Sequence, residues 1–257
     1  MSASKGYPVK PSGDHRMSTY TTTLTAREEI AEGTMAFHFE KPNGFAFRPG
    51  QAIDLIIAQP PTTAGDQSTR HTFSVVSAPF ENELVVATRM RDSVFKRALK
   101  SLLIGAQVMI DGPFGSLGLH QDRTRPALFI AGGIGITPFV SILRQAAKDR
   151  LPQRLILLYS NRRPEDAAFL AELQQLEIDN PHFQLVATMT AMRASTRPWT
   201  GHSELITGAL VKSVVAELAM PIYYVVGPPG MVEAIRQTLN LAGISDDDIR
   251  SEEFYGY

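Results

Sequence analysis

The segment Leu128-Phe-Ile-Ala-Gly-Gly-Ile-Gly-Ile-Thr-Pro-Phe139 decides the fold of this chain. Its apolar start, from Ala127 to Ala131, predicts a fully buried strand, and the glycines of Gly132-Gly-Ile-Gly135 predict a tight turn. A helix is expected from Thr137-Pro138, because proline is favourable in a first helical turn. Glycines let an anion approach the free N–H groups of a helix start, so the segment is a candidate phosphate site. A turn that binds nothing is the alternative, since the spacing differs from G-x-G-x-x-G.

The composition limits the classes of protein to which the chain can belong. Its 257 residues are 44% hydrophobic and 20% charged, with a net charge of −1, as in a globular protein of two domains. The balanced charge gives no electrostatic footprint for nucleic acid or for a membrane surface. The absence of cysteine excludes disulfides, cysteine-ligated zinc, iron–sulfur clusters and thiol nucleophiles. Without a membrane-spanning run or a signal peptide, we expect a cytoplasmic protein.

Residues 1–18 are a polar leader that we expect to be disordered. After it, the chain shows two different patterns of predicted elements, one in each half. Residues 19–123 show short alternating strands, typical of an antiparallel barrel or sandwich. These strands are 20–24, 34–40, 52–58, 72–76, 84–88 and 108–110, with a polar loop at 59–69, a helix at 93–103 and a sharp turn at 112–115. In residues 124–257, strands alternate with helices, which predicts a doubly wound parallel sheet. These strands are 128–131, 155–160, 183–188 and 222–226, and the helices are 138–150, 165–176, 205–219 and 230–242.

Two stretches of the first half carry candidate binding groups. On one strand His71 and Phe73 face one side, while Thr72 and Ser74 face the other. A ring and a hydroxyl at such a strand end are suited to a flat heterocycle, although this alternation is also ordinary for a half-buried strand. The segment Arg89-Met-Arg-Asp-Ser93 opens a helix with two arginines, which makes a second candidate anion site, with a simple helix cap as the alternative.

Four motifs occur in a fixed order along the chain. They are His71-Thr-Phe-Ser74, Gly112-Pro-Phe-Gly-Ser116, Ala131-Gly-Gly-Ile-Gly-Ile-Thr-Pro138 and Gly227-Pro-Pro-Gly-Met231. Together they resemble the ferredoxin–NADP reductase family of flavoenzymes over Tyr20 to Tyr257. The resemblance implies an antiparallel flavin-binding β-barrel followed by a doubly wound parallel-sheet nicotinamide-binding domain, the same architecture that the rhythm of the elements indicates.

The resemblance implies a set of flavin-binding residues. Phe73 would lie against the isoalloxazine ring, and Ser74 would hydrogen-bond near flavin N5, where the hydride arrives. The family motif has arginine where this chain has His71, so either His71 or Arg70 would face the flavin phosphates. Two separate phosphate segments favour FAD over FMN. The flavin-binding residues implied are Arg70, His71, Thr72, Phe73, Ser74, Arg89, Met90, Arg91, Ser93, Gly115 and Ser116.

The resemblance also implies the nicotinamide side of the site. The glycine turn would bind the dinucleotide's pyrophosphate, with Thr137 near the nicotinamide. Val226 stands where many members have a cysteine. In the C-terminal segment, Phe254 would cover the flavin, with Tyr257 as the alternative ring, and Glu252 would handle protons, although a frayed tail is the alternative reading. The nucleotide-binding and ring-covering residues implied are Gly132, Gly133, Gly135, Thr137, Ser160, Arg162, Arg163, Gly227, Pro228, Met231, Phe254 and Tyr257. The catalytic residues implied are Ser74, Thr137, Glu252 and Phe254.

The choice of nicotinamide cofactor depends on the charge near the adenosine ribose. Ser160, Arg162 and Arg163 offer donors and positive charge at the end of the second parallel strand, and no acid precedes Glu165. Arginine suits a 2′-phosphate, so NADPH is favoured over NADH. The alternative is a solvated helix start, capped by Asp166.

The function implied is that of an FAD-dependent NAD(P)H oxidoreductase. Hydride from NADPH, or NADH, would reach FAD, and single electrons would leave to a ferredoxin, a flavodoxin, an oxygenase component or a small acceptor. The alternative is a flavin-binding electron-transfer or regulatory subunit without nicotinamide turnover, which Val226 favours. The scattered histidines predict no metal site, and no Gly-x-Ser-x-Gly elbow supports a hydrolase. Trp199 is expected to pack a loop over the second domain.

Overall fold

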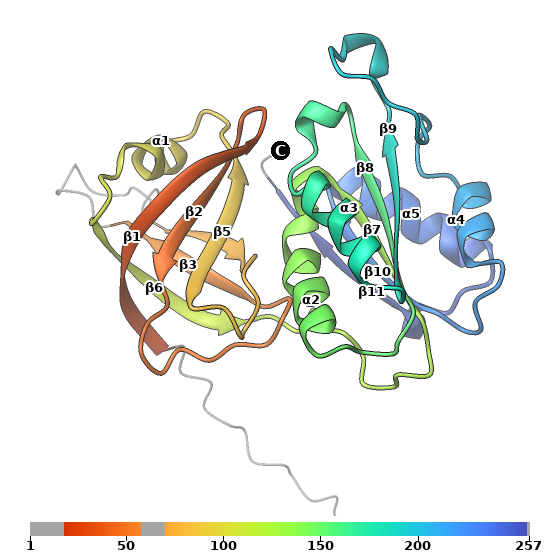
Figure 1. The fold of residues 1–257 in the computed structure, drawn as a ribbon, viewed down its shortest axis with the longest axis horizontal. Coiled ribbons are helices and arrows are strands. Elements are labelled where there is room, and N and C mark those ends of the chain that lie inside the picture. Colours follow the sequence, from red (N-terminus) through yellow and green to blue (C-terminus); the bar gives the residue numbers. More distant parts are fainter. Residues whose placement is uncertain (1–17, 58–69, 256–257) are drawn as a thin grey trace, which may run out of the picture.

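Residues 18–57 and 70–255 are described by the structure, a computed structural model (Figure 1). The predicted leader, apart from Ser18, the polar loop at 59–69 and Tyr257 lie outside the described residues. Within the described residues, no helix has the length and hydropathy needed to cross a membrane.

The first half is an antiparallel six-stranded sheet with the strand order β4-β3-β6-β1-β2-β5. A bridge between Val75 and Val86 joins the continuation of β4 to β5, so the sheet closes on itself as a barrel. Apolar side chains such as Phe37, Phe39 and Ile53 fill the interior, and Leu99 of the α-helix that follows β5 packs against them. The elements are β1 Ser18–Ala31, β2 Thr34–Glu40, β3 Ala52–Ile56, β4 Arg70–Ser74, β5 Glu83–Arg89, α1 Val94–Ser101 and β6 Gln107–Phe114. The predicted antiparallel barrel is confirmed.

The second half is a parallel five-stranded sheet with the order β11-β10-β7-β8-β9. Helices α2 and α3 pack on one face of the sheet, and α4 and α5 pack on the other (Figure 1). The elements are β7 Ala127–Gly132, α2 Thr137–Lys148, β8 Leu155–Asn161, α3 Leu170–Asp179, β9 Phe183–Met189, α4 Gly208–Val215, β10 Ile222–Gly227, α5 Pro229–Leu241 and β11 Ile249–Glu253. The predicted doubly wound sheet is confirmed.

The two halves share one hydrophobic core. Val76 and Leu117 of the barrel half belong to the same buried cluster as Phe139 and Ile142 of α2. Within this interface the Ser141 hydroxyl donates a hydrogen bond of 2.7 Å to the carbonyl of Ser77. Helix α2 is therefore held directly against the barrel. This contact fixes the helix start, and with it Thr137, relative to the barrel strands.

The strand order reverses between β7 and β10, where ligands bind in open α/β sheets. At this point the glycine turn touches the end of β10: a Cβ on Gly135 would lie 2.5 Å from the carbonyl oxygen of Val226. A Cβ on Gly132 would lie 2.4 Å from the sulfur of Met231. Gly135 is thus required by the close approach of two backbones, whereas Gly132 leaves room for the side chain of Met231. Gly133, with φ +51°, forms the bend between them.

Two elements of the first half, and the C-terminal segment, differ from the sequence prediction. Strand β1 continues to Ala31, seven residues beyond the predicted end at Leu24, because it pairs with β2 through two register shifts. The predicted turn at 112–115 is wrong in part, since β6 runs on to Phe114 and pairs it with Ala52. The C-terminal segment, for which a frayed tail was the alternative, includes a strand that was not predicted, β11, paired in parallel with β10.

Two helices of the second half are shorter than predicted. The helix expected at 165–176 is a 3₁₀ turn, Pro164–Asp166, followed by α3 from Leu170. Asp166 does not cap α3, because its carboxylate pairs with Arg163 and the helix starts after Phe169, whose φ is 60°. Helix α4 begins only at Gly208, where the hydroxyl of Thr207 accepts a hydrogen bond from the N–H of Leu210.

Candidate functional site

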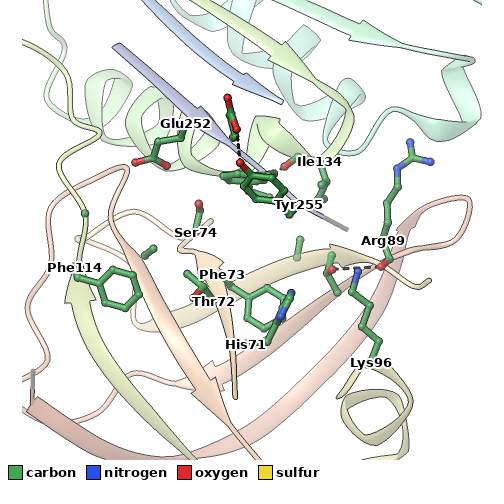
Figure 2. Close-up of a pocket in the computed structure, with 17 residues that line it drawn as sticks. His71, Thr72, Phe73, Ser74, Arg89, Lys96, Phe114, Ile134, Glu252 and Tyr255 are labelled. Atoms are coloured by element: carbon green, nitrogen blue, oxygen red, sulfur yellow. Dashed lines mark hydrogen bonds between the residues drawn. The ribbon is translucent and has the colours of Figure 1, made fainter. Parts of the chain in front are cut away.

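A cavity of about 470 Å³ lies between the two halves (Figure 2). Strands β4, β5 and β6 form its barrel side, and the start of α2 and the C-terminal strand form the opposite side. The lining residues are Ala52, His71, Thr72, Phe73, Ser74, Ala87, Thr88, Arg89, Lys96, Phe114, Gly115, Ile134, Thr137, Glu252, Glu253, Phe254 and Tyr255. All four residues predicted as catalytic, Ser74, Thr137, Glu252 and Phe254, therefore line the same space.

The barrel wall combines aromatic rings with one hydroxyl. The His71 ring lies 4.9 Å from the Phe73 ring and 5.4 Å from the Phe95 ring, so His71 and Phe73 share a face, as predicted. Ser74 is buried, and among the described residues its hydroxyl has no hydrogen-bond partner. Figure 2 shows this hydroxyl directed into the cavity. The wall thus offers apolar surface beside one free polar group, as ligand sites commonly do.

The opposite wall starts at the glycine turn. Ile134 and Thr137 line the cavity, and the Thr137 hydroxyl donates a hydrogen bond of 3.0 Å to the carbonyl of Ile134. Thr137 is the first residue of α2 and is followed by Pro138 in the first helical turn. A hydroxyl oxygen that donates in this way keeps its lone pairs for accepting a hydrogen bond from a ligand. The predicted strand, turn and helix therefore place Thr137 in the wall of the cavity.

The C-terminal strand completes the cavity. The backbone N–H of Phe254 donates to the carbonyl of Gly227 at 2.9 Å, which ties the end of β11 to the reversal point of the sheet. The Phe254 side chain packs against the shared core, whereas Tyr255 is 75% exposed, with its hydroxyl 2.5 Å from the carboxylate of Glu253. Tyr255 is thus a further ring at the cavity mouth that the sequence prediction missed (Figure 2).

Glu252 is the acidic group of the cavity whose protonation is shifted. Burial raises the pKa of its carboxyl above the ordinary 4.5. Because the folded chain holds this proton more tightly than the unfolded chain, stability is lost as the pH rises through the interval above 4.5. We therefore expect Glu252→Gln to be more stable than the wild type near pH 8, with the difference vanishing below about pH 4. Urea unfolding of both proteins at the two pH values measures this; a pH-independent difference would contradict it.

The predicted phosphate-binding residues are only partly gathered at the cavity. Arg89 and Gly115 line it, while Ser93 caps α1 by accepting from the N–H of Lys96 at 3.2 Å. Arg70 does not line the cavity, because its guanidinium pairs with Asp54, at 2.9 Å, and with Asp111. Of the remaining predicted residues, Met90 packs against the barrel core, Arg91 is exposed, and Ser116 lines a second cavity of about 510 Å³ that shares Gly115 with the first.

The sequence prediction missed two charged residues that line the cavity, Lys96 and Glu253. The side chain of Lys96 is buried and lines the cavity beside His71 (Figure 2). The signal for it was weak, since a lysine in the first turn of an amphipathic helix is usually solvated. Only the folded structure places it beside the motif strand, 22 or more residues away in the sequence.

The two arginines expected at the adenosine ribose differ in their surroundings. Arg163 pairs with Asp166 at 2.8 Å and with Glu32 of the barrel half at 3.0 Å, and these partners raise its pKa. Arg162 is exposed, and its guanidinium has no ion pair within the described residues. Ser160 lies beside Gly132 in neighbouring strands. Arg162, and not Arg163, is therefore the cation available near the glycine turn.

A loop follows β9 near these arginines. Glu165 accepts hydrogen bonds from Ser195 and Thr196, and these bonds outweigh the effect of burial and lower the pKa of Glu165 to about 2. Trp199 packs against the shared core and donates from Nε1 to the carbonyl of His202 at 2.8 Å, in line with its predicted role in a loop.

Across residues 18–57 and 70–255, no three His, Asp or Glu side chains form a cluster suited to a metal ion.

Comparisons with known proteins agree with this arrangement. Residues 129–237 match the family model of the oxidoreductase NAD-binding domain. The glycine betaine monooxygenase reductase subunit of Chromohalobacter salexigens is 24% identical over 86% of this chain and 60% of its own length. The toluate 1,2-dioxygenase electron transfer component of Pseudomonas putida is 27% identical over 91% of this chain and 67% of its own length. The chain thus spans about two thirds of the length of these two relatives.

Solved structures share the whole two-part fold. A ferredoxin NADP⁺ reductase from Neisseria gonorrhoeae, solved with bound FAD and NADP, superposes with a TM-score of 0.76 at 21% identity, covering 91% of this chain and 98% of that one. A cytochrome P450 reductase from Amycolatopsis superposes with a TM-score of 0.78 at 22% identity, covering 95% of this chain and 73% of that one. The chain therefore has the two-part fold of these reductases, and its residues 129–237 match an oxidoreductase NAD-binding domain.

Proposed function

We propose that this chain is an FAD-dependent NAD(P)H oxidoreductase that passes electrons to a protein acceptor, such as an oxygenase component, a ferredoxin or a flavodoxin, or to a small acceptor. The observation that carries the proposal is the single cavity lined by Ser74 of β4 and Thr137 of α2. A flavin held by the barrel and a nicotinamide held by the parallel sheet must meet between the two halves, and this cavity lies there. The cytoplasm remains the proposed location.

The residues present fit a flavin. The cavity volume of about 470 Å³ is in the range of small-molecule sites, and its barrel wall offers aromatic surface together with the unpaired hydroxyl of Ser74. Gly115, with φ +95°, leaves open space at the end of β6, where a side chain would stand at any other residue type. A contact between domains that was purely structural would need neither the unpaired Ser74 hydroxyl nor the space beside Gly115.

The bound cofactors supply hydride and single-electron chemistry that no side chain of this chain can perform. The residues contribute position and polarity. Ser74 would donate its hydroxyl hydrogen to the reacting ring edge, and Thr137 would bound the nicotinamide side. Phe254 and Tyr255 would exclude water from the cavity mouth, and Glu252 would hold or release a proton beside Ser74. With no cysteine, the chain itself supplies no ligands for an iron–sulfur centre, so electrons would leave from the exposed flavin edge.

The alternative of a subunit without nicotinamide turnover receives no support from Val226. This side chain is buried in the shared core and does not line the cavity. The replacement of a family cysteine at this position therefore removes no polar group from the space where the rings would meet.

A direct test is to add FAD to the purified chain, remove the unbound flavin and titrate with NADPH and NADH in the absence of oxygen. Uptake of flavin followed by bleaching of its absorbance, with electrons then passed to ferricyanide, is the expected result. Uptake without bleaching by either nicotinamide would support the electron-transfer subunit instead. Failure to bind flavin would contradict both functions.

The cofactor preference is tested at the two arginines. We expect Arg162→Ala to lower kcat/KM for NADPH about 10- to 100-fold while leaving that for NADH within about threefold, because it removes a charge-assisted contact to the 2′-phosphate. Arg163→Ala serves as the matched control, since Arg163 is already paired with Asp166 and Glu32. Equal losses with both nicotinamides in Arg162→Ala would retire the NADPH assignment.

A further inference from the structure

The family motif has an arginine where this chain has His71. In the structure, neither His71 nor Arg70, the two predicted substitutes, offers a free positive charge. The His71 ring packs against the rings of Phe73 and Phe95, and burial and then the neighbouring Lys96 lower its pKa, which favours the uncharged ring. The guanidinium of Arg70 is held by Asp54 and Asp111, away from the cavity. A flavin phosphate on this wall would therefore lack a positive partner at the motif itself.

Lys96 supplies the missing charge. It is the third residue of α1, its side chain is only 8% exposed, and it lines the cavity beside His71 (Figure 2). Within the described residues its ammonium has no ion pair and no hydrogen-bond partner, although the N–H of its own backbone is capped by Ser93. A buried cation without a partner is costly, so its presence points to an anion that binds beside it.

The surroundings of Lys96 favour an anion over a neutral ligand group. The first turn of α1 contains no acidic residue, and the first N–H groups of a helix have no partner within the helix. Arg89 also lines the cavity, but its guanidinium donates to the carbonyl of Asp166 at 3.2 Å and so bridges the two halves. Of the two cations that line the cavity, Lys96 is the one whose side chain has no hydrogen bond within the described residues. Burial and then the nearby Arg91 lower the pKa of Lys96, and an anion bound beside its ammonium would offset both effects.

We propose that the ammonium of Lys96 binds the flavin phosphate, in place of the arginine that the family motif carries at the position of His71. This inference rests on the proposed function, because it takes the flavin as the occupant of the cavity. His71 is then a part of the cavity wall that packs against the rings of Phe73 and Phe95. The specificity consequence is a preference for phosphorylated flavins, FAD and FMN, over riboflavin.

The test compares the affinities of the flavin-free protein for FAD, FMN and riboflavin, measured by quenching of flavin fluorescence. We expect Lys96→Met to weaken binding of FAD and FMN about 10- to 100-fold and to leave riboflavin within about threefold. Lys96→Arg should restore most of the loss. Lys100→Met, one turn further along α1 and exposed, should leave all three affinities unchanged.

A second measurement separates this role from a structural one. Because Lys96→Met removes a buried unpaired charge, the flavin-free variant should have a higher Tm than the flavin-free wild type, although it binds FAD less tightly. Equal weakening for riboflavin and FAD, or no weakening at all, would overturn the assignment of Lys96 while the proposed function stands. A wild-type protein that binds none of the three flavins would overturn the proposed function, and this inference with it.

Discussion

Ser74→Ala is expected to slow reduction of the bound flavin by NADPH about 100-fold, the loss typical of removing one donor directed at a reacting centre. The reason is the free hydroxyl: Ser74 is buried and directed into the cavity, without a hydrogen-bond partner in the described part of the chain. Its contribution to binding of the oxidised flavin should be much smaller, about 1 kcal/mol for one neutral hydrogen bond. Stopped-flow absorbance of the flavin after mixing with NADPH measures the rate.

The control for this prediction is Ser213→Ala. Ser213 lies in α4, on the face of the sheet away from the barrel, and its hydroxyl donates to the carbonyl of Leu210 at 2.8 Å. This variant should reduce its flavin at the wild-type rate. If Ser74→Ala kept that rate as well, Ser74 would be a wall residue without a role in the reaction.

Gly135→Ala should cost about 2–3 kcal/mol of the free energy of unfolding, as expected for overpacking where little can relax. The added Cβ would stand 2.5 Å from the carbonyl oxygen of Val226 and 3.0 Å from the Cα of Gly227, and both atoms belong to the backbone of β10. Since a backbone contact cannot be relieved by a change of rotamer, the turn must move away from the strand. The nicotinamide dinucleotide should therefore also bind more weakly.

Gly230→Ala is the matched control, because nothing lies within 4 Å of the Cβ it would add in α5. It should be neutral or stabilising by up to about 1 kcal/mol, since alanine is the better helix former. Denaturation in guanidinium, followed by circular dichroism, compares the two variants. A Gly135→Ala protein as stable as Gly230→Ala would mean that the glycine turn tolerates a side chain, contrary to the packing described above.

The second half of the fold was largely predictable from sequence, because its strands are continuous apolar runs. The segments at 128–131 and 222–226 are buried on both faces, and such runs stop at the glycines that end β7 and β10. The barrel was harder. The end of β1 carries Arg27, Glu28 and Glu29, which show no alternation, and it is a strand only because β2 pairs with it. Local pattern cannot report such long-range pairing.

The site was predictable where a motif fixes one strand or one turn. Local sequence was enough to predict the segment His71 to Ser74, the turn at Gly132 to Gly135, and Thr137. The charges did not, because pairing depends on residues far along the chain. Arg163 meets Glu32, 131 positions away, and Arg70 meets Asp111, 41 positions away. The loss of these two cations to structural ion pairs, and the burial of Lys96, are visible only in three dimensions.

One of the hydrophobic clusters and the candidate cavity are each built from both halves of this molecule, and this has a thermodynamic consequence. A ligand that binds only the native state stabilises every segment whose unfolding destroys its site. A flavin bound to the barrel side of the cavity therefore also stabilises the parallel sheet against unfolding. A nucleotide bound at the sheet likewise stabilises the barrel. Melting of the loaded protein should accordingly be a single cooperative transition whose midpoint rises with the concentration of either ligand.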